Sequence, residues 1–245
     1  MNGSADGEGL GPAVRENNGS GPGGDTANWW KSKWLAVGEL SVVAVIFVVH
    51  KHLHFFGTTP YLLLFGWISL RVRKLRWRDI GLKRFRNWKI TVGLGVAAGL
   101  LFEGFELFVS QPLLMKLLRT PPHFEDFRSL TGNLKLTLIS LVLTWTLAAF
   151  GEEMVYRGYL MNRVADLMNR TRVAWIISLI VVHVGFGIAH GYQGIVGVID
   201  EGLQGMLLGL LYLRTERNLS VPIIAHGIAD TCDVVLIFLG KYPGL

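Results

Sequence analysis

An apolar run that passes directly into a pair of glutamates decides the fold, and residues 134–158 read LKLTLISLVLTWTLAAFGEEMVYRG. A helix needs about 20 mainly apolar residues to span a membrane, and residues 134–161 are long enough. A charged side chain at the bilayer centre costs roughly 2.5–3.5 kcal/mol on insertion scales. Glu152 and Glu153 would not stand in a segment that only had to cross a membrane, so they predict a functional site inside one.

Two later apolar segments carry ionisable residues at four-residue spacing. Residues 186–190 read FGIAH at the end of one segment, and residues 226–230 read HGIAD near the start of another. The intramembrane ionisable groups would together cost on the order of 10 kcal/mol before any pairing; they are Glu152, Glu153, Arg157, His190, His226 and Asp230. Pairing among them is therefore expected.

The composition is that of a membrane protein. Of the 245 residues 51% are hydrophobic and 17% are charged, whereas a soluble domain usually has about 25% charged residues. The single cysteine excludes an internal disulfide framework and a zinc site built from several cysteines. Residues 1–28 are rich in Gly, Asn, Ser and Asp and show no apolar period, which predicts a disordered polar tail before a membrane domain over 29–245.

Hydropathy predicts an all-α, polytopic transmembrane helical bundle of about seven spans, with eight as the alternative. The candidate spans are Trp34–His50, Pro60–Leu70, Ile90–Met115, Leu134–Met161, Val173–His190, Gly194–Leu213 and Val221–Leu239. The second is short enough to be partly interfacial.

The basic residues are gathered in one loop rather than spread over a face. Nine of the 24 Lys and Arg residues lie in Arg71–Lys89, between two apolar runs. This is typical of a cytoplasmic loop, and it argues against nucleic acid as a partner. Alternation from this loop predicts a cytoplasmic N-terminus in an integral, multi-pass protein of the cell (cytoplasmic) membrane or an ER-type membrane, with membrane lipids as partners.

The spacing of the ionisable residues suggests a division of tasks. On an α-helix Glu153 and Arg157 are four apart and face each other, which leaves Glu152 free to act as a general base. His190 shares a helical face with Phe186 and is placed to help Glu152 polarise a water. Asp230 can orient His226, whose N–H can then serve a developing oxyanion.

Simple antiparallel counting raises a conflict of depth. It places Glu152 level with His190, but His226 falls near the start of the last span. All three can meet only if one element is bent or re-entrant, and we expect that irregularity in the Gly-rich segment Gly185–Gly209.

In order and spacing these motifs resemble those of the CPBP family, the membrane proteases that include the type II CAAX prenyl endopeptidases. The family pattern is Glu-Glu-x-x-x-Arg, Phe-x-x-x-His and His-x-x-x-Asn/Asp, and the motif-bearing core here is 134–239. The resemblance implies an intramembrane endopeptidase acting on a membrane-associated peptide or lipidated protein. It also implies Glu152 and His190 as water activators, and His226 with residue 230 as oxyanion stabilisers. Glu153, Arg157 and Phe186 would support them. The prenyl endopeptidases have Asn where Asp230 stands.

The sequence leaves an alternative open both for the cofactor and for the function. The chain has no His-Glu-x-x-His zinc motif, and we favour a site without metal or other cofactor. Glu152, His190 and His226 could still form a three-ligand zinc site. A proton-coupled transporter could use buried charges as a relay, and a non-catalytic membrane immunity or partner protein could keep the fold without the activity.

Overall fold

The computed structural model describes residues 32–53, 57–85 and 87–245, and these contain no β-strand. The α-helices in chain order are α1 (Lys33–Leu53), α2 (Thr59–Val72), α3 (Trp88–Phe105), α4 (Gln111–Leu118), α5 (Leu134–Leu143), α6 (Met161–Leu167), α7 (Arg172–Ala189), α8 (Gly194–Arg214) and α9 (Ser220–Phe238). Two π-helical segments, η3 (Glu106–Ser110) and η5 (Thr144–Leu160), join α3 to α4 and α5 to α6. Short 3-10 turns are η2 (Trp77–Ile80), η4 (Glu125–Leu130) and η6 (Gly191–Gln193).

The all-α membrane bundle predicted from hydropathy is confirmed. Six helical stretches within the described residues are long and apolar enough to span a membrane: Lys33–His50, Trp88–Leu118, Leu134–Leu167, Arg172–Ala189, Gly191–Arg214 and Ser220–Phe238. The seventh predicted span is α2, whose 14 residues fall short of the roughly 20 that a full crossing needs. Large apolar side chains such as Leu101, Phe108 and Ile188 point outward, where lipid would cover them.

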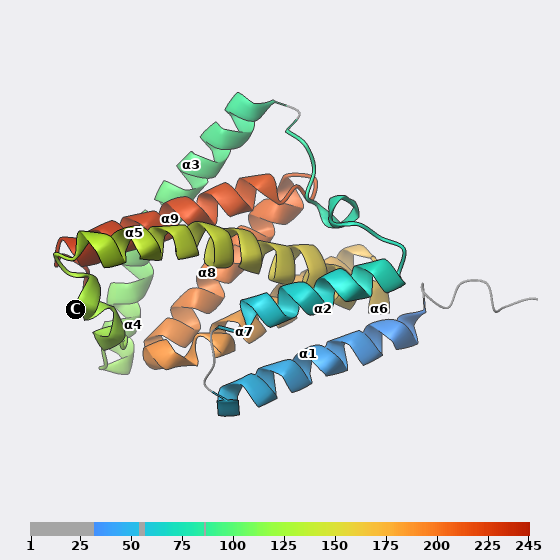
Figure 1. The fold of residues 1–245 in the computed structure, drawn as a ribbon, viewed down its shortest axis with the longest axis horizontal. Coiled ribbons are helices and arrows are strands. Elements are labelled where there is room, and N and C mark those ends of the chain that lie inside the picture. The colour runs from blue at the N-terminus through green and yellow to red at the C-terminus, as the bar shows by residue number, and fades with distance from the viewer. Residues whose placement is uncertain (1–31, 54–56, 86) are drawn as a thin grey trace, which may run out of the picture.

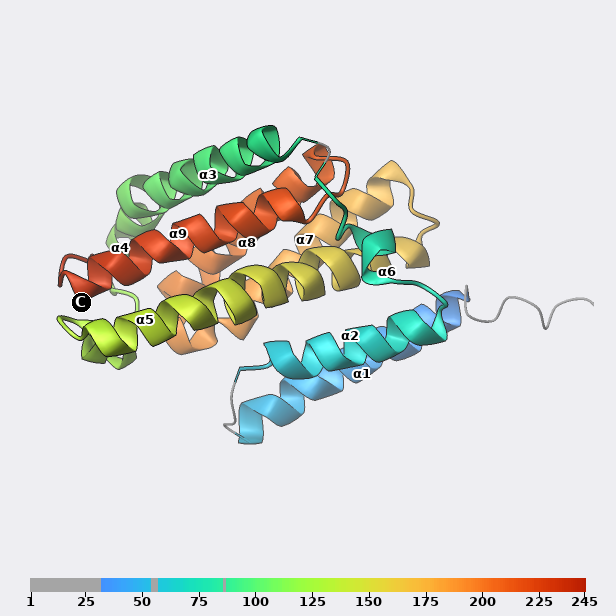
Figure 2. The same cartoon turned by 45° about the horizontal axis from the view of Figure 1, so that its top comes forward.

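The bundle is arranged around one long helix, with other helices on its two flanks. Helices α1 and α2 lie side by side as a hairpin on one flank, and α3 lies on the opposite flank beside α9 (Figures 1 and 2). The continuous helix α5–η5–α6 runs between them and packs against both α2 and α9. The main apolar core gathers around this helix, with Met154, Tyr159 and Met161 packed against Leu62 and Tyr212. Glu152 and Glu153 therefore lie on the helix around which the apolar core gathers.

Helices α3 and α9 approach closely because glycines face α9. A Cβ at Gly99 would lie 2.5 Å from the backbone oxygen of Ala225 and 2.9 Å from Cβ of Ile228, whereas a Cβ at Gly93 of the same helix would meet nothing within 4 Å. Close approach of the two helices thus depends on Gly99 and not on Gly93.

We expect Gly99→Ala to lower stability and Gly93→Ala not to lower it. Overpacking costs typically about 1–3 kcal/mol, so Gly99→Ala should lower the unfolding temperature in detergent. Gly93→Ala should leave it unchanged or raise it, because Ala in a helix is favoured over Gly by roughly 0.5–1 kcal/mol. Equal unfolding temperatures for the two variants would contradict the packing described.

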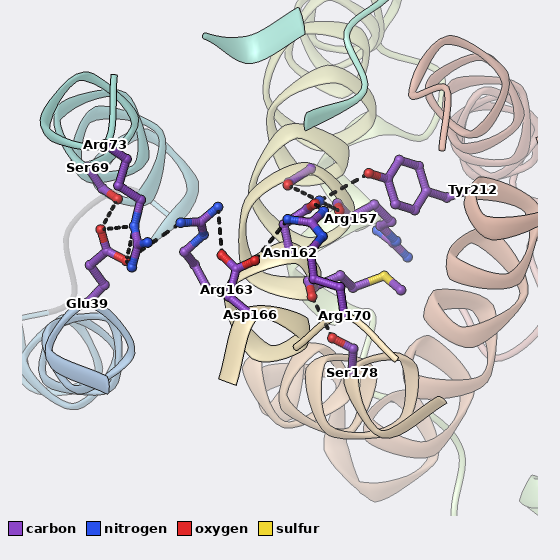
Figure 3. A network of polar contacts seen from close by, with 12 residues as sticks. Glu39, Ser69, Arg73, Arg157, Asn162, Arg163, Asp166, Arg170, Ser178 and Tyr212 are labelled. Carbon is purple, nitrogen blue, oxygen red and sulfur yellow. Dashed lines mark hydrogen bonds and ion pairs between the residues drawn. The ribbon is translucent and has the colours of Figure 1, made fainter. Parts of the chain in front are cut away.

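A buried polar network ties the α1–α2 hairpin to α6 (Figure 3). Glu39 of α1 accepts hydrogen bonds from Ser69 at 2.5 Å and from Nη2 of Arg73 at 2.6 Å. Arg163 of α6 lies 4.0 Å from Glu39 and 3.1 Å from Asp166, and it is itself buried. The hairpin is thus anchored to the long helix by ionic contacts at the end of the bundle that carries the basic 73–87 loop.

The expectation of a re-entrant element between Gly185 and Gly209 is wrong. Helices α7 and α8 are regular and are joined by the short turn η6, and their glycines serve close packing instead: a Cβ at Gly187 would lie 2.2 Å from the backbone oxygen of Val198. The irregular geometry lies in η5, which carries Glu152 and Glu153.

His226 can lie at the depth of the acidic pair because the long helix α5–η5–α6 extends beyond the start of α9. A Cβ at Gly158 would lie 3.0 Å from Cδ1 of Leu219, so α9 begins level with Gly158 and α6 extends past it. His226, near the start of α9, is thereby placed level with Glu153. The predicted tail, 1–28, lies outside the described residues, and the cytoplasmic N-terminus stays a prediction.

Candidate active site

The acidic pair occupies two different environments on η5. Glu153 is fully buried, and its Oε1 accepts a hydrogen bond from Nη1 of Arg157 at 2.6 Å. This is the contact expected from their four-residue spacing. Glu152 is only partly buried, and its Oε1 is 3.4 Å from the hydroxyl of Thr59. One carboxylate is therefore fixed by a cation, while its neighbour is held by a weak neutral donor.

Arg157 is enclosed on all sides by its contacts. Its Nη2 donates to the backbone oxygen of Gly205 at 3.0 Å, and its guanidinium lies over the ring of Phe186, 4.9 Å from the centroid. Phe186 in turn contacts the His190 ring at 4.5 Å between centroids. The supporting residues Arg157 and Phe186 thus connect Glu153 to His190 through packed side chains.

His226 lies between two carboxylates. Its Nδ1 is 2.9 Å from Oε1 of Glu153, and its Nε2 is 3.4 Å from Oδ1 of Asp230. Asp230 is thus in reach of His226, as expected from the spacing, but Glu153 is closer. The second carboxylate was not predicted because it comes from another helix.

His190 ends α7 and has one ring nitrogen committed. Its Nδ1 is 2.9 Å from the backbone oxygen of Phe186, which fixes the ring plane and leaves Nε2 for another partner. Glu152 interacts electrostatically with both His190 and His226. The structure therefore brings together Glu152, His190, His226 and Asp230, from three helices that are separated in the sequence.

Thr59 was not singled out in the sequence. It opens α2, outside the segment that carries the motifs, and a Cβ at Gly151 would lie 2.7 Å from its Cγ2. The glycine before Glu152 thus allows α2 to approach the carboxylate. The sequence around Thr59 carries no signal for this contact, because the contact depends on how the hairpin docks.

The geometry does not fit a zinc ion held by Glu152, His190 and His226. Both ring nitrogens of His226 already face carboxylate oxygens, at 2.9 and 3.4 Å. Within the described residues no group of three or more His, Cys, Asp or Glu side chains is arranged to hold a metal ion. To ligate a metal, His226 would have to give up Glu153 or Asp230.

Comparison with known proteins gives one match. Residues 134–232 match the family model described as type II CAAX prenyl endopeptidase Rce1-like. No curated protein and no solved structure matches the chain. The matched segment runs from the start of α5 into α9 and contains Glu152, His190, His226 and Asp230. Through this segment the chain is similar to the Rce1-like type II CAAX prenyl endopeptidases, which are membrane peptidases.

Proposed function

We propose that the chain is an intramembrane endopeptidase that hydrolyses a peptide bond in a membrane-associated or lipidated substrate. The observation that carries this proposal is the array Glu153–His226–Asp230 beside the partly exposed Glu152 and His190. A span alone would not need it, because each buried ionisable group costs free energy in a membrane.

In the proposed reaction Glu152 is the general base. Its carboxylate takes a proton from water, with His190 Nε2 holding that water, and the water oxygen attacks the scissile carbonyl carbon. The carbonyl oxygen becomes an oxyanion. When the tetrahedral intermediate collapses, the carbon–nitrogen bond breaks and protonated Glu152 returns the proton to the leaving amine.

His226 is the proposed oxyanion donor. With both ring nitrogens protonated, Nδ1–H donates to Glu153 at 2.9 Å, which fixes the ring. Nε2–H faces Asp230 at the longer distance of 3.4 Å and can donate to the oxyanion instead. Preorganised donors of this kind contribute about 10²–10³-fold in rate. Asp230, an acceptor when ionised, orients the histidine and does not itself donate.

The function is tested by reconstituting the full chain in liposomes with paired peptides. One peptide ends in a farnesylated CAAX sequence, and the other is identical but carries no lipid. Mass spectrometry identifies the products. Cleavage of the farnesylated peptide supports a prenyl endopeptidase, and cleavage of both supports a broader endopeptidase. No cleavage by the folded, inserted protein of either peptide, or of the natural cleavage site defined below, would contradict the proposal.

We also propose that the reaction proceeds without metal, because His226 is committed to two carboxylates. Activity should survive phenanthroline and exhaustive chelation, and elemental analysis should find no stoichiometric zinc in active protein. About one zinc per chain, with activity lost on removal and restored on return, would refute this and make Glu152, His190 and His226 ligands of a Lewis-acid centre.

A further inference from the structure

A cavity beside His226 is lined by five carboxylates, of which the proposed reaction uses Asp230 alone. Its acidic lining residues come from α3, η3, α8 and α9 and are Glu103, Glu106, Glu201, Asp230 and Asp233. All the lining residues lie in the described part of the chain, and among them His226 alone can carry a positive charge. It already has two carboxylate partners. The far end of the cavity therefore has acceptors without a cation.

Two carboxyl groups in this cavity, those of Glu103 and Asp233, have no hydrogen-bond donor other than each other. Glu103 is 4% exposed, and neither of its carboxylate oxygens has a hydrogen-bond partner among the described residues. Oδ1 of Asp233 likewise has no partner among the other described residues, and the carboxyl groups of Glu103 and Asp233 can share a hydrogen bond only with each other. Buried polar groups are normally hydrogen-bonded, and exceptions ask for an explanation. Here the missing group is a donor, and the surrounding charge calls for a cation.

We infer that this acidic end of the cavity is a subsite for a protonated primary amine, the side chain of a substrate lysine. An ammonium group offers three N–H donors and no acceptor, which suits the paired carboxyl groups of Glu103 and Asp233, for which no other residue supplies a donor. The cavity, about 40 Å³, suits this compact head better than a planar guanidinium, which carries five donors in a fixed fork.

A metal ion fits this end of the cavity less well. Hard cations such as Ca²⁺ take six to eight oxygen ligands at about 2.3–2.6 Å. The side chains here do not converge in that way, since the described residues hold no group of three or more arranged for a metal. An ammonium needs only hydrogen-bond distances, so it is satisfied by acceptors that stand further apart.

The subsite lies close to the proposed reaction centre. His226, Asp230 and Asp233 follow one another along the same side of α9. Seven residues of helix separate His226 from Asp233, a rise of about 10 Å. A lysine beside the scissile bond could extend along α9 to reach Glu103 and Asp233. The inference rests on the proposed function for the substrate, although the amine site itself does not depend on catalysis.

Binding is tested first, without any substrate. The full-length protein in detergent is titrated with n-butylammonium, which reproduces the lysine side chain, and with n-butanol as the uncharged counterpart. We expect saturable thermal stabilisation by butylammonium alone. Glu103→Gln and Asp233→Asn should each weaken it about 10- to 100-fold, as expected for loss of a hydrogen bond to a charged group. Glu125→Gln, in the exposed segment η4, should leave it unchanged.

Selectivity is tested second, on the cleaved peptide. Lysine, arginine or norleucine is placed in turn at each position next to the scissile bond. The ratio of kcat/KM for lysine over norleucine should be about tenfold or more at one position and should fall in Glu103→Gln and Asp233→Asn. Absence of saturable butylammonium binding would overturn the inference. So would binding by Glu103→Gln and Asp233→Asn that is as tight as binding by the natural chain. Intact amine binding by a protein that cleaves no peptide would support the subsite and remove the proposed function instead.

Discussion

Glu152→Gln is expected to abolish peptide hydrolysis while the protein remains folded and inserted. Losing a general base typically costs roughly 10²–10⁴-fold in rate. The substitution keeps the shape of the side chain, and Glu152 takes no part in the buried contact of Glu153 with Arg157. Folding should therefore be spared. The measurement is kcat/KM of the reconstituted protein on a peptide carrying its cleavage site, together with the unfolding temperature.

Two other variants are compared with Glu152→Gln. Glu125→Gln removes a carboxylate from an exposed position of η4 and should retain full activity. His190→Ala should be as inactive as Glu152→Gln, because its Nε2 is proposed to hold the same water. Near-full cleavage by purified Glu152→Gln protein would end the proposed mechanism.

Arg157→Ala should cause the largest loss of stability. Arg157 and Glu153 are both fully buried, 2.6 Å apart, and removing one partner of a buried ion pair costs about 3–5 kcal/mol. The substitution also removes the donor to Gly205 and the cation over the Phe186 ring. We expect a sharply lower unfolding temperature in detergent and poor recovery of folded protein.

Arg170 provides the matched control. It pairs with Asp166 at 2.8 Å, also four residues apart, but its side chain is 40% exposed. Exposed pairs contribute about 0–1 kcal/mol, so Arg170→Ala should shift the unfolding temperature far less. An Arg157→Ala protein as stable as Arg170→Ala but inactive would move Arg157 from a structural role to substrate binding.

The sequence predicted those features that depend on local spacing. Apolar runs predicted the helices, because in lipid each backbone polar group must be paired within its own segment. The contact of Glu153 with Arg157 followed from a separation of four residues on one helix. The reach of Asp230 to His226 followed in the same way.

Features that depend on the relative depth of helices could not be predicted in this way. The approach of Glu153 to His226 requires α6 to overhang the start of α9, and the length of that overhang is set by packing near Gly158 and Leu219. Thr59 reaches Glu152 only because the α1–α2 hairpin docks against η5. The π-helical geometry of η5 itself leaves no periodic signal that distinguishes it from an α-helix.

The central claim, that this membrane protein cuts a peptide bond by means of Glu152, is tested most directly by comparative proteomics of cell membranes. Membranes from cells producing the natural chain are compared with membranes from cells producing equal amounts of Glu152→Gln, and all new peptide termini are identified. The account predicts at least one terminus, in a membrane-associated protein, that appears with the natural chain and is missing with Glu152→Gln. Identical sets of termini from the two membranes would contradict it and would favour a non-catalytic role for the same fold.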